Sequence, residues 1–268
     1  MRDISREELA SYAERVTEEA VKALAADGDT ATARIRNLMK KIRRRILIIM
    51  EDLHDEFSES EFEPRFFEMQ LSADDGPSPV TYTLPDGTTL VLRGTVDRVD
   101  AYKKNGKLYL RVVDYKTGTK SFSLDDIERG INLQLLVYLF SLWKNKRESF
   151  RNRLGITEDE EVLPAGMLYM MASTADITLP KPLSPDEVRE EAKRDLTRSG
   201  LLLDDMEVLT AMDKELSGRY IPVTMTKKGE FGKRSTQSLA TLSEMGDLAK
   251  RLDEIIEEIG TGDRKSVV

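Results

Sequence analysis

The sequence predicts an α/β fold, because helical and strand-like patterns alternate along its 268 residues. Apolar residues recur at helical spacing in residues 4–57, and the turn signal Asp27-Gly28-Asp29 divides this stretch into two expected helices. Segments rich in β-branched and aromatic residues come next, separated by turn signals. They predict strands over residues 62–71, 80–84, 88–102 and 107–115.

Helical and strand patterns also alternate in the second half of the chain. An amphipathic stretch over residues 124–145 predicts a helix, and residues 166–171 predict a short buried strand. From Pro185 onward we expect an acidic helix, a hairpin around Lys227 to Gly229, and a last helix near residues 239–259. A chain of this length with 40% hydrophobic residues can bury one large core or two modest ones.

The composition excludes several kinds of site. The chain has no cysteine, so disulfides, cysteine-bound zinc and an iron–sulfur cluster held by this chain are excluded. The single histidine, His54, argues against multi-histidine metal sites. The longest aliphatic stretch, Ile46 to Met50, is too short to cross a membrane, and residues 1–10 lack a signal-peptide pattern. We therefore expect a cytoplasmic protein without a membrane partner, whose chemistry depends on carboxylates, lysines and tyrosines.

The charge is unevenly distributed along the chain. A net charge of -8 argues mildly against nucleic acid as a partner, because phosphate binding favours basic surfaces. Acidic residues are dense in 51–63 and 186–215, whereas basic residues gather in one expected helix. Those basic residues are Arg34, Arg36, Lys40, Lys41, Arg43, Arg44 and Arg45.

The main site prediction comes from Asn105-Gly106, a dipeptide typical of two-residue type I′ hairpin loops. If these residues form the loop, Asp97 lies directly opposite Asp114 on the same face of the sheet. Their Cβ atoms would be about 4.5 to 5.5 Å apart, where like charges destabilise a sheet. A divalent cation such as Mg²⁺ would remove this penalty, since it binds carboxylate oxygens at about 2.0 to 2.1 Å. Lys116 follows on the same face, where it can hold an attacking water or a phosphate oxygen.

A purely structural interpretation of the same residues stays open at this point. In that interpretation Asp97 forms an ion pair with Arg98 or Arg93, and Lys116 is the solvated end of a strand. The two interpretations differ in what neutralises the aspartates, a metal ion or a neighbouring arginine.

Three ordered motifs resemble those of RecB-like PD-(D/E)xK nucleases. They are Gly94-Thr-Val-Asp97-Arg-Val-Asp100, Val113-Asp114-Tyr115-Lys116-Thr-Gly118 and Gly130-Ile-Asn-Leu-Gln134-Leu-Leu-Val-Tyr138. Three motifs in this order are far more specific than a lone Asp-x-Lys pattern. Other segments resemble the C-terminal nuclease domain of the AddB component of bacterial helicase–nuclease complexes, namely Phe62-Glu-Pro64, Pro164-Ala-Gly166-Met-Leu-Tyr169, Gly200-Leu-Leu-Leu-Asp204 and Ile221-Pro-Val.

The resemblance implies a restriction-endonuclease-like core, a central mixed sheet flanked by helices. An N-terminal helical segment would occupy residues 1–60, the nuclease core residues 61–180, and an α+β extension of the same domain residues 181–268. The resemblance also implies roles for individual side chains of the core. Asp97 and Asp114 would bind Mg²⁺, for which Mn²⁺ can substitute, Lys116 would be the signature lysine, and Glu68 a further acidic member of the catalytic site.

Two further groups of residues are candidates for DNA binding. Gln134 and Tyr138 are four residues apart on an expected helix, so they share a face and can reach DNA or the catalytic lysine together. For Tyr138 the alternative is simple packing against the sheet. Arg43 and Arg44 would contact phosphates of single-stranded DNA, or form part of a solvated helix face.

The implied function is a metal-dependent DNA exonuclease that acts on single-stranded DNA delivered by a partner helicase in double-strand-break repair. The alternative is a catalytically weak nuclease-like module that binds DNA or serves as a scaffold. Two departures from the family pattern qualify the first function. His54 does not occupy the position of the upstream-helix histidine of RecB-like nucleases, and the cysteines that often hold an iron–sulfur cluster are absent. We therefore expect a trimmed fragment with weak nuclease activity.

Overall fold

The computed structural model describes residues 4–25, 33–71, 76–118, 121–172 and 184–262. The chain divides into two compact units, of which the first combines residues 1–59 with 171–197 and the second combines residues 60–170 with 198–268. The expected boundary at residue 60 lies at the end of the first unit's opening segment. The expected boundary at residue 180 lies outside the described residues.

Helices make up the first unit. The helices α1 (Arg6–Ala25) and α2 (Ala33–Glu59) pack against each other, which confirms the prediction of two helices in this stretch. The third helix, α6 (Pro185–Arg194), packs against α2. It begins with a capping box, in which Ser184 and Glu187 satisfy each other's backbone N–H groups.

The grouping of α6 differs from the sequence-based division, which placed it in the C-terminal extension. Ala192 and Leu196 pack around Ile48 of α2, and Lys193 donates a hydrogen bond of 2.7 Å to Asp55. Periodicity shows that a segment is helical and which side of it is apolar, but it does not show which distant helix covers that side. The tertiary contacts decided the grouping.

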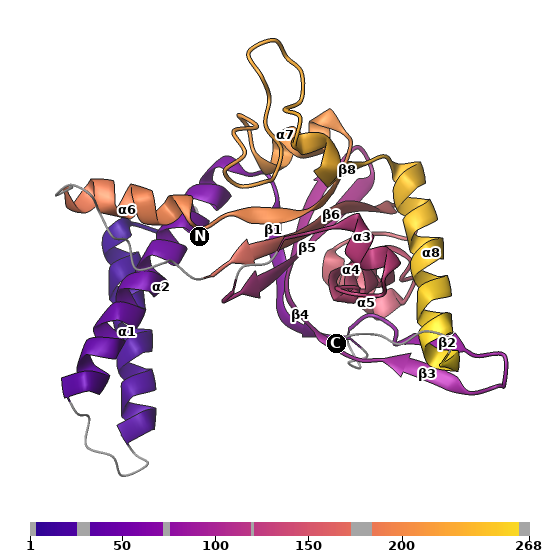
Figure 1. Cartoon of the computed structure of the whole chain (residues 1–268), viewed down its shortest axis with the longest axis horizontal. Coiled ribbons are helices and arrows are strands. Elements are labelled where there is room, and N and C mark those ends of the chain that lie inside the picture. Colours follow the sequence, from indigo (N-terminus) through magenta and orange to yellow (C-terminus); the bar gives the residue numbers. More distant parts are fainter. Residues whose placement is uncertain (1–3, 26–32, 72–75, 119–120, 173–183, 263–268) are drawn as a thin grey trace. The chain divides into compact units, whose positions relative to one another are not determined.

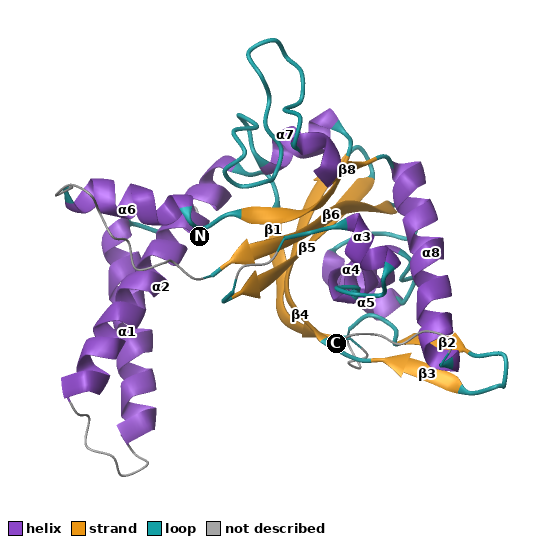
Figure 2. Ribbon diagram, in the orientation of Figure 1, coloured by secondary structure: helices purple, strands orange, loops and turns teal. Residues whose placement is uncertain are grey.

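The second unit is built on a six-stranded mixed sheet (Figure 2). Three of the neighbouring strand pairs are antiparallel, β1 with β4, β4 with β5, and β6 with β7, while β7 and β8 are parallel. A central mixed sheet with helices is the predicted fold class, which is confirmed. In spatial order the strands are β1 (Glu63–Gln70), β4 (Thr95–Lys104), β5 (Lys107–Lys116), β6 (Glu161–Met171), β7 (Arg198–Leu203) and β8 (Leu239–Ala240).

Five helices and a separate hairpin complete the second unit within the described residues. The helix α4 packs against β5, and α8 packs against α4 (Figure 1). The strands β2 (Val80–Thr83) and β3 (Thr89–Leu92) form a two-stranded antiparallel sheet of their own. The helices are α3 (Leu124–Glu128), α4 (Gln134–Trp143), α5 (Glu148–Leu154), α7 (Met206–Met212) and α8 (Leu242–Thr261).

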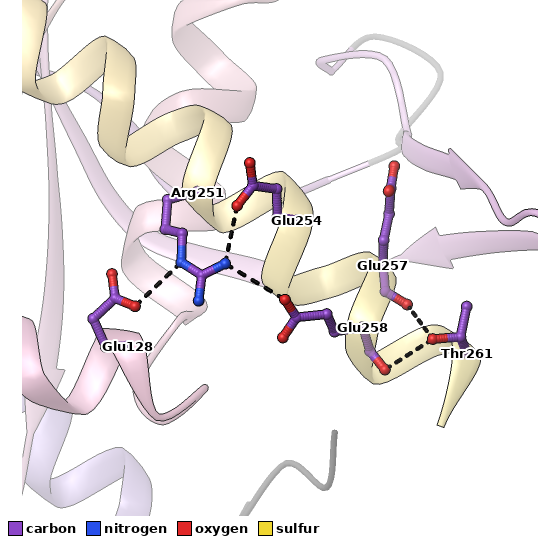
Figure 3. Close-up of polar contacts among 6 residues, drawn as sticks. All are labelled: Glu128, Arg251, Glu254, Glu257, Glu258 and Thr261. Atoms are coloured by element: carbon purple, nitrogen blue, oxygen red, sulfur yellow. Dashed lines mark hydrogen bonds and ion pairs between the residues drawn. The ribbon is translucent and has the colours of Figure 1, made fainter. Parts of the chain in front are cut away.

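Arg251 of α8 connects this long helix to the short helix α3 (Figure 3). Its Nε donates to a carboxylate oxygen of Glu128 at 3.1 Å, while its Nη1 donates to Glu254 at 2.9 Å and to Glu258 at 3.4 Å. The helix α8 therefore supports the segment that leads into the Gln134 helix.

Two predicted elements are interrupted in the structure. The expected strand over residues 88–102 is divided into β3 and β4 by Arg93 and Gly94. The expected helix over residues 124–145 is divided into α3 and α4, because Gly130 and Asn132 adopt positive φ angles of 76° and 60°. The patterns also give no sign of α5, β7, α7 or β8, which are short. All but one residue of β7 are buried, so it shows no polar alternation.

Candidate active site

The hairpin that joins β4 to β5 has the predicted turn and register. Asn105 and Gly106 both have positive φ angles, 50° and 73°, as a type I′ loop requires. The ladder pairs every residue from Arg98 to Lys104 with its predicted partner on β5, and Arg98 lies opposite Val113. One further step along this register places Asp97 opposite Asp114, on the same face. Asp97 Oδ2 accepts a hydrogen bond of 2.8 Å from the backbone N–H of Tyr115.

Asp114 and Lys116 form an ion pair on that face. The Asp114 side chain is almost fully buried, and Lys116 Nζ lies 2.6 Å from its Oδ2. A buried carboxylate needs a nearby cation, because removing an unpaired charge from water is costly. The Lys116 side chain is only 27% exposed, so it is not a freely solvated strand end as the structural interpretation required.

Tyr169 is a member of this site that the sequence patterns did not identify as functional. It lies on β6, next to β5 in the sheet, and its ring centroid is 5.8 Å from Lys116 Nζ. Burial, followed by the negative charges of Asp114 and Asp126, raises the pKa of Tyr169 to about 12. Its hydroxyl is therefore protonated at neutral pH. The segment Pro164 to Tyr169 belonged to the resemblance, but nothing in it indicated that this tyrosine faces the lysine.

Glu68 lies on the neighbouring strand β1, in an unusual conformation. Its neighbours Phe67 and Met69 pair with Arg98 and Val96, so the register places Glu68 level with Asp97. Its φ angle is 48°, a left-handed value that is uncommon for a residue other than glycine. Within the described ranges, no three Asp, Glu or His side chains come together as a possible metal site. Asp97 and Asp114 are therefore the candidate ligands without Glu68.

Gln134 and Tyr138 lie one turn apart on α4 and contact each other. Gln134 Nε2 donates a hydrogen bond of 2.8 Å to the Tyr138 hydroxyl. Gln134 is exposed, whereas Tyr138 is buried with 5% of its surface accessible. A Cβ atom at Gly94 would lie 2.3 Å from the Tyr138 hydroxyl, so this close approach requires glycine. The third motif thus packs directly on the first residue of the first motif, three residues before Asp97.

Arg43, Arg44 and His54 lie in the first unit, on α2. Arg43 Nη1 is 2.5 Å from a carboxylate oxygen of Glu14 on α1, and Arg44 is exposed. His54 Nδ1 is 3.8 Å from Asp55. These residues belong to a different compact unit from Asp97, so they are described separately from its site.

The opposite face of the β4–β5 hairpin is also charged. Arg98 Nε lies 3.0 Å from Asp100, and Arg111 Nη2 lies 2.7 Å from Asp100, with all three side chains buried. Arg98 also donates a hydrogen bond of 2.9 Å to the Tyr115 hydroxyl. These arginines thus neutralise Asp100 on a face that Asp97 and Asp114 do not share.

The chain is similar to proteins with a nuclease function. The model of the PD-(D/E)XK nuclease superfamily matches residues 2–263. Three curated relatives are each named as the B-type chain of an ATP-dependent helicase/deoxyribonuclease. The protein from Clostridium acetobutylicum is 34% identical over 74% of this chain and 16% of its own length. The protein from Clostridium novyi is 35% identical over 77% and 18%.

The third relative, from Acetivibrio thermocellus, is 29% identical over 96% of this chain and 22% of its own length. In each case the match covers less than a quarter of the relative's length. The superfamily match extends over both units and includes the β4–β5 hairpin with Asp97, Asp114 and Lys116. This chain therefore belongs to the PD-(D/E)XK nuclease superfamily.

Proposed function

We propose that this chain hydrolyses phosphodiester bonds of DNA as a Mg²⁺-dependent exonuclease. The observation that most supports this function is the Asp114–Lys116 ion pair at 2.6 Å, on the face to which the register assigns Asp97. Membership of a nuclease superfamily gives this arrangement its chemical meaning.

The donor set suits a divalent cation. Mg²⁺ usually takes one or two protein carboxylates and completes its coordination with waters and substrate phosphate. Asp97 and Asp114 supply two carboxylates from adjacent strands, and the Tyr115 N–H group holds one oxygen of Asp97 in place. When bound, the ion would acidify a water molecule and stabilise negative charge on the phosphate.

Lys116 has the protein's own part in the proposed reaction. Its ammonium group would hold the attacking water or a non-bridging phosphate oxygen, since it lies beside Asp114 and over the Tyr169 ring. Water attacks phosphorus, the bond to the leaving ribose oxygen breaks, and that oxygen takes a proton. Gln134, exposed at the start of α4, is placed to contact the DNA strand, and Tyr138 holds its amide.

The substrate and partner are proposed from the relatives. Their name includes both a helicase and a deoxyribonuclease. We propose that this chain acts on single-stranded DNA that a helicase partner delivers during break repair. Arg43 and Arg44 would contact phosphates of the incoming strand.

A digestion assay tests the function directly. Wild type and Lys116→Ala are incubated with end-labelled single- and double-stranded DNA at a series of Mg²⁺ and Mn²⁺ concentrations. We expect metal-dependent cleavage of single strands by wild type, and a loss of about 100-fold to 1000-fold in the variant. Circular dichroism and Mn²⁺ binding should be unchanged in the variant, because Lys116 is not a ligand.

Two outcomes would contradict this function. Cleavage by Lys116→Ala at the wild-type rate would remove the lysine from the mechanism. Wild type that binds DNA but cuts it with neither metal would instead support the module that binds DNA without catalysis.

A further inference from the structure

The segment from Lys214 to Arg234, here called the basic hairpin, has an unusual charge for this acidic chain. It contains six basic residues and only two acidic ones, in a chain of net charge -8. All six basic residues are exposed or partly exposed. They are Lys214, Arg219, Lys227, Lys228, Lys233 and Arg234.

The cations near the tip of this hairpin differ from other lysines of the second unit. Elsewhere Lys103, Lys144 and Lys250 form ion pairs with Glu160, Asp253 and Asp247. Within the described part of the chain, no carboxylate forms an ion pair with Lys227, Lys228, Lys233 or Arg234. Cations without an internal partner are available to an external anion.

The hairpin is a firmly built structure. Met225 and Phe231 form a bridge, and Thr226 N–H donates to the Glu230 carbonyl at 2.8 Å, so Lys227 and Lys228 occupy the turn. At the base, the buried Ser235 hydroxyl accepts a hydrogen bond of 2.9 Å from Thr224 N–H. Lysines held on a rigid turn lose less entropy on binding than lysines on a floppy loop.

Thr224 also packs the two sides of the hairpin tightly together. A Cβ atom at Gly232 would lie 2.2 Å from its Oγ1, and one at Gly218 would lie 2.5 Å from its Cγ2. Both positions therefore require glycine, and the cationic turn is displayed on a closely packed base.

The basic hairpin is remote from the candidate active site. It follows α7, beyond which it extends in Figure 1, and Glu207 of α7 forms an ion pair with Lys104. Lys104 lies at the turn end of β4, seven positions from Asp97. At about 3.3 Å per residue, this is a separation of about 23 Å along the strand. The hairpin therefore cannot hold the scissile phosphate itself.

We infer that the basic hairpin is a second contact site for the phosphate backbone of DNA, distant from the bond that is cut. The inference rests on the proposed function, because it takes DNA as the ligand. A separation of about 23 Å matches about seven base pairs at 3.4 Å each, so one DNA molecule can reach both sites. The contacts are to phosphates alone and do not select sequence.

Fluorescence anisotropy with labelled DNA in EDTA tests this inference without any cleavage. Lys227→Ala/Lys228→Ala is compared with Lys144→Ala/Lys250→Ala, which removes two lysines that are already ion-paired. We expect Kd to rise about tenfold only in the hairpin variant. The slope of log K against log salt should fall by about 0.9 per lost contact on duplex DNA and about 0.7 on single strands.

Further measurements make the result decisive. Lys227→Arg/Lys228→Arg should bind like wild type, and an oligonucleotide much shorter than about 20 Å should not distinguish any of the variants. Unchanged Kd and salt slope in the alanine variant, with normal thermal unfolding, would overturn the inference, as would an equal loss in the control. If the hairpin effect appears but no metal supports cleavage, the proposed function fails while the second contact site stands.

Discussion

The two faces of the β4–β5 hairpin present aspartates in opposite situations. On one face Asp100 lies between Arg98 and Arg111, and the charges compensate within the protein. On the other face, two aspartates share one lysine at the level of Asp114. A strand places alternate residues on opposite faces, so adjacent parts of one motif end up in different environments.

This contrast shows how a short motif can serve structure and chemistry at once. A buried ion pair with several hydrogen bonds is expensive to break, which favours a fixed hairpin. An undercompensated pair of carboxylates is a poor structural feature but a good site for a cation. The same substitution on each face should therefore have a different main effect.

The largest effect should come from Asp114→Asn, on the site face. We expect cleavage to fall about 1000-fold, because the variant loses a charged metal ligand. The free energy of unfolding should stay within about 1 kcal/mol of wild type, since repulsion with Asp97 is relieved. Single-turnover cleavage and urea unfolding measure the two quantities, and normal cleavage with lowered stability would reverse the assignment of the faces.

Asp100→Asn makes the same chemical change on the opposite face. It leaves Arg98 and Arg111 buried without their carboxylate, which should lower the free energy of unfolding by about 3 to 5 kcal/mol. Urea unfolding checks this value. Under conditions where the variant is folded, its metal dependence of cleavage should match wild type. A shifted metal dependence at unchanged stability would show that Asp100 belongs to the active site.

A smaller effect is expected from Gly94→Ala, which tests the contact between the two outer motifs. The added methyl group would meet the Tyr138 hydroxyl, and such overpacking costs about 1 to 3 kcal/mol. Part of this loss should return in Gly94→Ala/Tyr138→Phe, which removes the hydroxyl. Thermal unfolding of both variants and of Tyr138→Phe completes the cycle. Additive effects would mean that the two residues do not press on each other.

The site was more predictable than the parts that support it, for a physical reason. Hairpin register depends on a two-residue turn and on alternation along the strands, both of which are local. The same local logic assigned Tyr115 to the face opposite Asp114, where its hydroxyl binds Arg98. The interruption of the strand at Gly94 was not predictable, because it depends on Tyr138, far away in the sequence.

The sequence by itself determined the α/β class, the two N-terminal helices, the Asn105-Gly106 turn and the register that follows from it. Its ordered motifs also determined the superfamily. Only the tertiary structure decided that Tyr169 lies over Lys116, that α6 joins α2, and that the basic hairpin is far from Asp97. These features arise from contacts between segments distant in the chain, which local periodicity does not encode.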